Sequence, residues 1–244
     1  QVECTRTLSG HQSDVKAVVF NRRGELISGA EDGSIRVWDV LSGVCLRLTP
    51  NAHADSVLAL CIFDNERFVS ASADSTVKIW ADKSGSGGES SLKCVATLTG
   101  HTGWVSTLAP LAGHKLLVSG SADKKNKVWQ VESSSGSGDT QWACLRTLHG
   151  HSNSVRAVVA NRSGAQLFSA SYDNKIKVWD TESGACMRTL CGHRDGVFTL
   201  LLIGAAGWVV LWRSSPLALQ HQPLTLPLAA RFIPRQASLS LHLL

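Results

Sequence analysis

The sequence has 244 residues, with 24 Lys and Arg against 19 Asp and Glu, so its formal net charge is +5. The residues up to Asp195 hold 21 of the basic side chains and all 19 acidic ones, which leaves that region nearly balanced. No aromatic residues alternate with the densest lysines, so we interpret these as a solvated face and expect no nucleic-acid partner. Those lysines are Lys124, Lys125, Lys127, Lys175 and Lys177.

One framework of four residues returns four times along the chain. A His is followed by a Ser 17 or 18 residues later, by an Asp four residues after the Ser, and by a Trp six residues after the Asp. A fifth copy begins at His193 and reaches no Asp. Repeats of this size are typical of propellers and solenoids, which build extended surfaces by stacking similar units. The four sets are His11, Ser28, Asp32 and Trp38; His53, Ser70, Asp74 and Trp80; His101, Ser119, Asp123 and Trp129; and His151, Ser169, Asp173 and Trp179.

Within the first repeat, short β-rich runs alternate with turn residues. The runs cover residues 15–20, 25–28, 35–38 and 44–49, and Gly, Asn, Asp and Ser residues lie between them. Four such runs predict one small antiparallel sheet per repeat. Because no apolar stripe of helical period and length occurs in residues 1–200, the predicted fold class is all-β.

Two segments rich in Ser and Gly explain why the second and third repeats are longer than the others. They cover residues 82–91 and 132–139, and each lies shortly after a framework Trp. Such a composition gains little by becoming ordered. We therefore predict flexible surface loops at both places.

The dipeptides near the two ends of each repeat resemble those of the WD40 repeat family, whose period is about 40–45 residues. The Gly-His pairs are Gly10-His11, Gly100-His101, Gly150-His151 and Gly192-His193, with Ala52-His53 as a variant. The Trp-Asp pairs are Trp38-Asp39 and Trp179-Asp180, with Trp80-Ala81 and Trp129-Gln130 as variants. The resemblance covers residues 1–202.

This resemblance implies both a fold and a role for the framework residues. Each repeat would be one four-stranded blade of a β-propeller, giving four complete blades and the start of a fifth. Propellers of this family commonly have more blades, so we expect an incomplete propeller. In the family the His, Ser, Asp and Trp form a buried hydrogen-bond network within each blade, a kind of network that specifies one packing arrangement when every member is satisfied. The repeats would begin near His11, His53, His101, His151 and His193.

Ser, His and Asp are also the residue types of a hydrolase catalytic triad. A nucleophile is needed once, whereas this set occurs four times at fixed spacing. The Gly-Ser-Gly sequences at residues 85–87 and 136–138 lie in the Ser- and Gly-rich segments, away from any strand-to-helix elbow of the kind that presents a nucleophile. We therefore expect a protein that is not an enzyme, with no catalytic residues and no cofactor.

Five of the seven cysteines occupy one position of the repeat, shortly before the His. No Cys-x-x-Cys pair exists, so we expect no metal site, and we expect these thiols to be small buried apolar groups. An odd number of thiols with no signal peptide is typical of a reducing compartment, which predicts a cytoplasmic or nuclear location. The five are Cys4, Cys45, Cys94, Cys144 and Cys186.

The resemblance also implies where a partner would bind. In WD40 proteins, contacts concentrate on the rim at three positions of each repeat: three residues after the His, five residues after it, and the residue before the Asp. Trp104, Arg156 and Tyr172 are of special interest because Trp, Tyr and Arg are enriched among interface hot spots. For Trp104 and Tyr172, packing between blades is the alternative. The candidate partner-binding residues are Asp14, Lys16, Glu31, Leu58, Trp104, Arg156, Tyr172 and Phe198.

Two parts of the chain depart from the repeat. Asn126 takes the place held by an Ile or Val in the other repeats, so a polar group would need a partner between blades. After Leu202 the framework is lost: no acidic residue follows Asp195, and four of the six prolines lie in this last part. We predict that residues 203–244 are a poorly ordered tail outside the repeats. The apolar run at 197–212 is shorter than the roughly 20 residues that span a bilayer, so we expect no membrane partner.

These observations favour a non-catalytic scaffold that presents its rim to a protein or peptide. The alternative is a substrate-recognition or regulatory module of a larger complex, such as a ubiquitin ligase or a kinase bearing WD40 repeats. The Trp-Asp-x-Arg adaptor signature is absent at residues 38–41 and 179–182. An open arc of blades would also leave edges uncovered, so self-association through those edges is a further expectation.

Overall fold

A computed structural model describes residues 4–84, 90–111, 116–133, 140–203, 208–212 and 240–241 of the protein. These residues form nineteen strands and no helix. Blade 1 contains β1 (Val15–Phe20), β2 (Leu26–Ala30), β3 (Ile35–Trp38) and β4 (Cys45–Thr49). Blade 2 contains β5 (Val57–Ile62), β6 (Arg67–Ser72), β7 (Val77–Ser84) and β8 (Ser90–Leu98). Blade 3 contains β9 (Val105–Pro110), β10 (Leu116–Ser121), β11 (Asn126–Ser133) and β12 (Thr140–Leu148). Blade 4 contains β13 (Val155–Ala160), β14 (Gln166–Ser171), β15 (Ile176–Asp180) and β16 (Cys186–Leu190).

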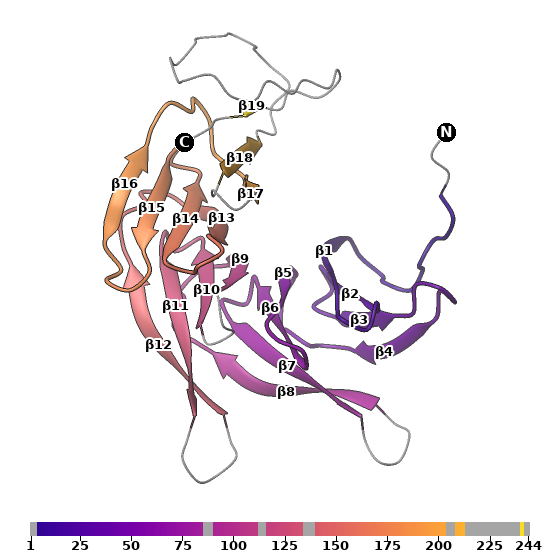
Figure 1. The fold of residues 1–244 in the computed structure, drawn as a ribbon. Coiled ribbons are helices and arrows are strands. Elements are labelled where there is room, and N and C mark those ends of the chain that lie inside the picture. The colour runs from indigo at the N-terminus through magenta and orange to yellow at the C-terminus, as the bar shows by residue number, and fades with distance from the viewer. Residues whose placement is uncertain are drawn as a thin grey trace.

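Each blade is a four-stranded antiparallel sheet whose strands pair in chain order. A fifth sheet contains β17 (Thr199–Ile203), β18 (Trp208–Trp212) and β19 (Ser240–Leu241). The blades follow one another in an open arc, with blade 1 at one end and the fifth sheet at the other (Figure 1). Their first strands, β1, β5, β9, β13 and β17, contact one another in turn along the inner side of the arc. The predicted all-β class and the incomplete propeller are both confirmed.

The turn between the second and third strands explains why the framework spacing is constant. In this turn the Asp side chain accepts a hydrogen bond from the backbone amide two residues later, as Asp123 Oδ1 does from Lys125 N at 3.0 Å. The residue between them must be left-handed, and its φ is 70° at Lys124. The third strand begins directly afterwards, so the Asp fixes where the Trp falls. The same left-handed position is held by Gly33, Ser75 and Asn174 in the other blades.

Neighbouring blades approach closely because a small residue of one faces a valine of the next. A Cβ added to Gly29 would lie 2.4 Å from Val57 Cγ1, and one added to Gly120 would lie 2.7 Å from Val155 Cγ1. Both valines are completely buried. The apolar core therefore consists of clusters that lie between blades as well as within them.

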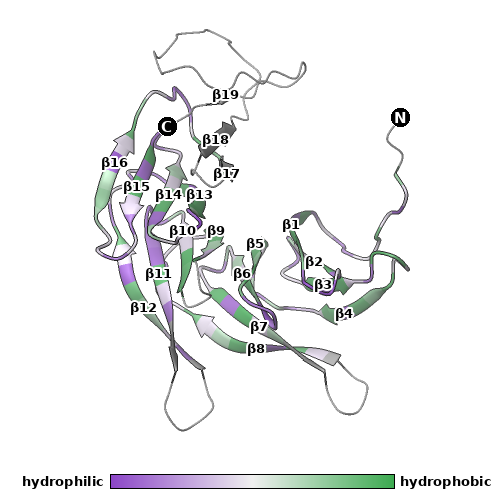
Figure 2. Cartoon of the chain, in the orientation of Figure 1, coloured by the Kyte–Doolittle hydropathy of each residue, from purple (hydrophilic) through white to green (hydrophobic). Residues whose placement is uncertain are grey.

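The first blade exposes the surface that its neighbours bury. Val15, Val18 and Phe20 of β1 are 49%, 59% and 59% exposed, whereas Val57, at the position of Val15, has no exposed area. Figure 2 shows hydrophobic residues along β1 at this end of the arc. An open end of this kind is what the incomplete propeller predicts.

Asn126 lies where the sequence indicated an unsatisfied polar group. Its side chain is fully buried between blades, and neither its Oδ1 nor its Nδ2 has a hydrogen-bond partner. A buried amide without partners costs free energy, whereas Ile35, Val77 and Ile176 place apolar atoms at this position.

The Ser- and Gly-rich segments differ in part from the expectation. Strands β7 and β8 continue to pair out to Ser84 and Ser90, and β11 and β12 pair out to Ser133 and Thr140. A hairpin can lengthen in this way because each added residue pair contributes backbone hydrogen bonds whatever its side chains. The expectation of flexible loops then concerns residues 85–89 and 134–139, which lie outside the described residues.

Part of the segment expected to be a tail forms strands. β18 pairs antiparallel with β17, and two residue pairs join it to β19. The prediction of poor order for the rest of residues 203–244 lies outside the described residues. Within the part of the chain that is described, no helix is long and apolar enough to cross a membrane.

The expectation that the repeated cysteines are buried is wrong. Cys94, Cys144 and Cys186 are exposed, and Cys45 is only partly buried. They lie on the fourth, outermost strand of each blade, where no further sheet covers them. In contrast Cys61, in the inner strand of blade 2, is buried, and burial raises the pKa of its thiol to about 12.

Candidate functional site

A buried chain of hydrogen bonds joins the framework residues of blade 3. The indole Nε1 of Trp129 donates to Ser119 Oγ at 2.8 Å, and Ser119 Oγ lies 2.8 Å from Nε2 of His101. The Nδ1 atom of His101 lies 2.7 Å from Asp123 Oδ2. Because the serine oxygen accepts from the indole, its own proton is directed to Nε2, and Nδ1–H donates to the carboxylate.

Blades 2 and 4 contain the same chain of contacts, with distances between 2.7 and 2.9 Å. All three networks therefore link the His-bearing loop to the Asp-bearing turn from inside the blade. The residues are His53, Ser70, Asp74 and Trp80 in blade 2, and His151, Ser169, Asp173 and Trp179 in blade 4.

Blade 1 departs from this pattern at its Asp. His11 Nε2 lies 2.6 Å from Ser28 Oγ, and Trp38 Nε1 donates to the same oxygen at 2.7 Å. The Nδ1 atom of His11, however, contacts Ser34 Oγ at 3.1 Å, while Asp32 accepts from the Ser34 backbone amide. Expecting a direct contact between His11 and Asp32 is therefore wrong, because the Ser34 hydroxyl takes the acceptor's place.

The networks favour the charged form of the aspartates, and those of blades 2 and 4 favour neutral histidine. Burial opposes ionisation of Asp123, but hydrogen bonds and charge interaction from His101, with backbone amides, outweigh it and lower its pKa to about 2. Asp74 behaves similarly, with Thr76 supplying the largest favourable hydrogen bonds, and its pKa is also about 2. Burial lowers the pKa of His53 and of His151 below the usual value, and the adjacent carboxylates only partly offset this.

The order of contacts matches that of a hydrolase triad, but the serines cannot meet a substrate. Ser70, Ser119 and Ser169 have no exposed area, and Ser28 is 3% exposed. Each oxygen also accepts a hydrogen bond from an indole, which occupies one of its two lone pairs. These networks therefore hold loops in place. Among the described residues, no three His, Cys, Asp or Glu side chains gather as a metal site would require.

The rim above the networks differs in charge from blade to blade. In blade 1, Lys16 Nζ lies 2.9 Å from Asp14 Oδ2 and 3.2 Å from Glu31 Oε2. These three candidate residues therefore neutralise one another in part. Leu58 of blade 2 follows the fully buried Val57 and is half-buried.

Trp104 of blade 3 projects from the rim. Its side chain is 59% exposed, while its carbonyl accepts a hydrogen bond from Ala122 N at 2.8 Å. Ala122 precedes Asp123, so the buried network holds the backbone that carries the indole. An indole packed between blades would be buried, so this exposed side chain does not fit that alternative.

Blade 4 and the segment that leads into β17 bring three more candidates together. The rings of Tyr172 and Phe198 meet edge to face with centroids 4.8 Å apart, and the guanidinium carbon of Arg156 lies 5.3 Å from the Tyr172 ring centroid. Tyr172 is 41% exposed. Its amide donates to Ser154 O, and a Cβ added to Gly196 would lie 2.7 Å from its Cδ1. Tyr172 thus packs against the segment that leads into β17 and still reaches solvent.

One link between the rim loops was not apparent from the sequence. Ser106 Oγ donates to the Val155 carbonyl at 2.7 Å, which joins the start of β9 to the start of β13. Trp104 lies two residues before Ser106, and Arg156 directly follows Val155. The only sequence signal for this hydrogen bond was the serine at the fifth position after His101. A serine alone does not indicate which acceptor its hydroxyl contacts.

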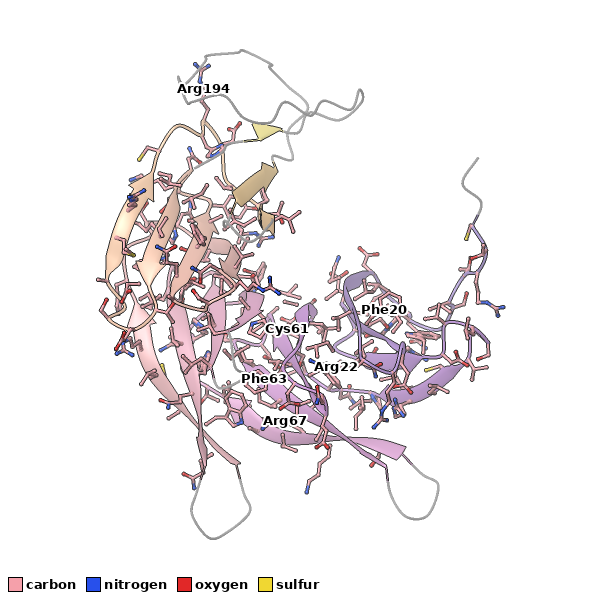
Figure 3. The ribbon with its side chains drawn as sticks, in the orientation of Figure 1. Phe20, Arg22, Cys61, Phe63, Arg67 and Arg194 are labelled. Carbon is pink, nitrogen blue, oxygen red and sulfur yellow. The ribbon has the colours of Figure 1, made fainter. Side chains whose placement is uncertain are left out.

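A second region of charge lies where blade 1 meets blade 2, at the β1–β2 and β5–β6 turns. Figure 3 shows Arg22, Phe63 and Arg67 near this junction. Arg67 pairs with Asp64 at 2.6 Å, and its guanidinium lies over the Phe63 ring. A shallow pocket between the blades is lined by these turns. Among its charged groups, Arg67 pairs with Asp64, and Arg47 pairs with Glu25 at 2.7 Å.

The sheets and networks together define a protein built from β-propeller blades of one repeated type. Four stretches match the family described as WD domain, G-beta repeat: residues 2–39, 43–81, 92–130 and 142–180. Because these matches cover more than half of the sequence, the chain belongs to the WD40 repeat family.

The chain is similar to parts of several other proteins. The chain is 34% identical over 131 residues to the Ribosome biogenesis protein WDR12 homolog of Ixodes scapularis, covering 52% of this chain and 29% of that protein. It is 30% identical over 148 residues to Nuclear distribution protein nudF of Aspergillus niger, covering 51% and 32%. It is 40% identical over 73 residues to Periodic tryptophan protein 2 of Arabidopsis thaliana, covering 29% and 8%. The matched part of the chain thus spans at most about a third of the length of each of these three relatives.

Proposed function

We propose that this chain is a non-catalytic scaffold that binds a protein or peptide partner on the rim formed by Trp104, Arg156 and Tyr172. The observation that carries the proposal is the contrast between exposed rim side chains and the buried networks that hold their loops. Large rings on a fixed backbone lose little conformational entropy when a partner covers them, and Trp, Tyr and Arg supply most interface hot spots.

The other candidate residues belong to this proposal in lesser roles. Phe198 supports the Tyr172 ring, and Leu58 offers apolar area in blade 2. Asp14, Lys16 and Glu31 form a polar edge whose charges are already paired, so their contribution to affinity is small. The sixteen framework residues act on binding only through the loops that they hold.

A pull-down with the purified chain, analysed by mass spectrometry, would provide a partner, and its affinity would then be measured by calorimetry. Replacing Trp104 by Ala should weaken binding about thirtyfold, or about 2 kcal/mol. The Lys16→Ala variant is the matched control on blade 1 and should bind normally. Equal affinity of Trp104→Ala and the unmodified chain would refute the rim proposal.

The uncovered face of β1 supports a second proposal, self-association of the chain. Val15, Val18 and Phe20 are all about half exposed or more, and the matching valine of blade 2 is buried by a neighbouring blade. Replacing Val18 by Lys should shift the chain toward monomer in light scattering after gel filtration. A chain that is monomeric before any substitution would contradict this proposal.

The names of the relatives, ribosome biogenesis protein and nuclear distribution protein, support the proposal of a cytoplasmic or nuclear protein. A role as one module of a larger complex, including a ubiquitin ligase or a kinase, remains the alternative proposal. Fluorescence microscopy of the tagged full-length protein tests the location.

A further inference from the structure

The rim positions of blades 1 and 4 can be compared residue by residue. Lys16 and Arg156 occupy the same position of the repeat, as the second residue of the inner strand. Around Lys16 the other two rim positions hold the carboxylates of Asp14 and Glu31, at 2.9 and 3.2 Å. Around Arg156 the same two positions hold Ser154 and Tyr172. Blade 4 therefore keeps the cation and replaces both of its anionic partners.

The guanidinium of Arg156 is consequently left without a charged partner. It forms no hydrogen bond or ion pair with the described residues, and its Nε atom is buried and unsatisfied. The side chain is half-buried, and its two terminal nitrogens are not among the buried atoms. A half-buried guanidinium without a charged partner has already lost part of its hydration. It therefore gains more free energy from binding an anion than a fully solvated guanidinium does.

Aromatic rings orient this cation. The Tyr172 ring lies 5.3 Å from the guanidinium carbon and is itself braced by Phe198. A guanidinium held in this way presents its terminal N–H groups as a fork that fits two oxygens of one carboxylate. The exposed parts of Tyr172 and, on the next blade, Trp104 offer apolar area for a neighbouring side chain.

We propose that Arg156 binds one Asp or Glu side chain of the peptide partner, and that an apolar residue beside this carboxylate covers the Tyr172 ring. This inference rests on the proposed rim function and names its ligand class. A single guanidinium balances the single charge of a carboxylate, whereas a phosphoryl group of nearly two charges calls for more than one cation.

Fluorescent nonapeptides with a central Glu between Leu and Phe residues serve as the probe, with matched peptides that carry Gln or phosphoserine at the centre. Anisotropy titrations are carried out with the complete chain. We expect the Glu peptides to bind about tenfold more tightly than the Gln peptides, because one charge-assisted contact is lost in the latter.

Two variants separate the carboxylate site from the rest of the rim. Arg156→Gln removes the fork, and Ser154→Asp restores the anion that blade 1 has at this position, so that the chain neutralises its own arginine. Both should lower Glu-peptide affinity about tenfold and leave Gln-peptide affinity unchanged. Arg162→Gln, in the turn between β13 and β14 of blade 4 and outside the rim positions, is the matched control and should change neither. Unfolding midpoints in urea establish that each variant is folded.

The outcomes distinguish this inference from the function on which it rests. If Trp104→Ala weakens peptide binding but Glu and Gln peptides bind equally, the carboxylate site is refuted and the rim proposal stands. Tighter binding of the phosphoserine peptides, or full binding by Ser154→Asp, also refutes the carboxylate site. If no peptide of the set binds in a manner that depends on Trp104, both proposals fail.

Discussion

The carbonyl of Trp104 accepts a hydrogen bond from the amide of Ala122 at 2.8 Å, so an exposed indole shares its backbone support with a buried network. The next residue, Asp123, bonds to His101 inside the blade. Core residues and rim residues are therefore adjacent in the chain, but we expect their substitution to have different effects. Removal of a core residue should cost stability, and removal of a rim residue should cost binding.

The first prediction compares two framework aspartates. Asp123→Ala leaves His101 and backbone amides without their acceptor and should lower the free energy of unfolding by about 1–3 kcal/mol. Asp32→Ala should cost less, because His11 contacts Ser34 in place of Asp32. Urea denaturation measures both. Equal losses would show that the direct His–Asp contact has no special weight.

The second prediction concerns the buried amide of blade 3. Asn126→Val removes two unsatisfied polar atoms and supplies the apolar group found at Val77, so the chain should gain about 1–2 kcal/mol of stability. Val77→Asn in blade 2 is the reciprocal change and should destabilise by a similar amount. A rise in stability from Val77→Asn, or a fall from Asn126→Val, would contradict the conclusion that this position favours an apolar side chain.

The third prediction concerns the left-handed turn residue after the Asp. Lys124 has a φ of 70°, which is strained for a residue with a Cβ, so Lys124→Gly should stabilise the chain by roughly 0.5–1 kcal/mol. Gly33→Ala should have the opposite effect, because its Cβ would lie 2.5 Å from the His53 carbonyl oxygen. Thermal unfolding midpoints of the two variants should move in opposite directions, and a common direction would be inconsistent with the turn geometry.

The fourth prediction is a loss of stability in acid. The folded pKa of Asp74 and Asp123 is about 2, below the ordinary value of 3.8, so the unfolded chain binds more protons as the pH falls between these values. Each carboxylate then contributes about 2 kcal/mol above pH 4 that is lost toward pH 2. His53 and His151 also have lowered pKa values, so their contribution is present above pH 6.5 and declines below it.

Urea unfolding at a series of pH values measures this dependence. Asp123→Asn provides the control, because it removes one titrating carboxylate and should flatten the curve below pH 4. A free energy of unfolding that stays constant or rises as the pH is lowered from 6.5 to 2 would contradict the assignment of ionised aspartate and neutral histidine.

The architecture could be predicted because it depends on local chemistry that repeats. The turn between the second and third strands fixes the distance from the Asp to the Trp. Four copies of this spacing therefore predicted four sheets from the sequence alone. The burial of Asn126 followed from its register with Val77. The sequence did not reveal that His11 contacts Ser34 instead of Asp32. The spacing of the framework residues is the same whichever side-chain oxygen lies beside the histidine.

Other features depend on contacts that spacing does not contain. The repeated cysteines were expected inside, but whether a strand is outermost depends on what lies beyond it in space. The resemblance predicted the rim positions, whereas the unpaired state of Arg156 depends on which side chains surround it in space.

The central claim, that the rim binds and the framework supports, is tested most directly by measuring unfolding and partner binding in Trp104→Ala and Asp123→Ala together. We expect Trp104→Ala to unfold at nearly the same urea concentration as the unmodified chain and to bind about thirtyfold more weakly. We expect Asp123→Ala to unfold at a clearly lower concentration. If Trp104→Ala loses as much stability as Asp123→Ala, Trp104 is a core residue and the rim account is wrong.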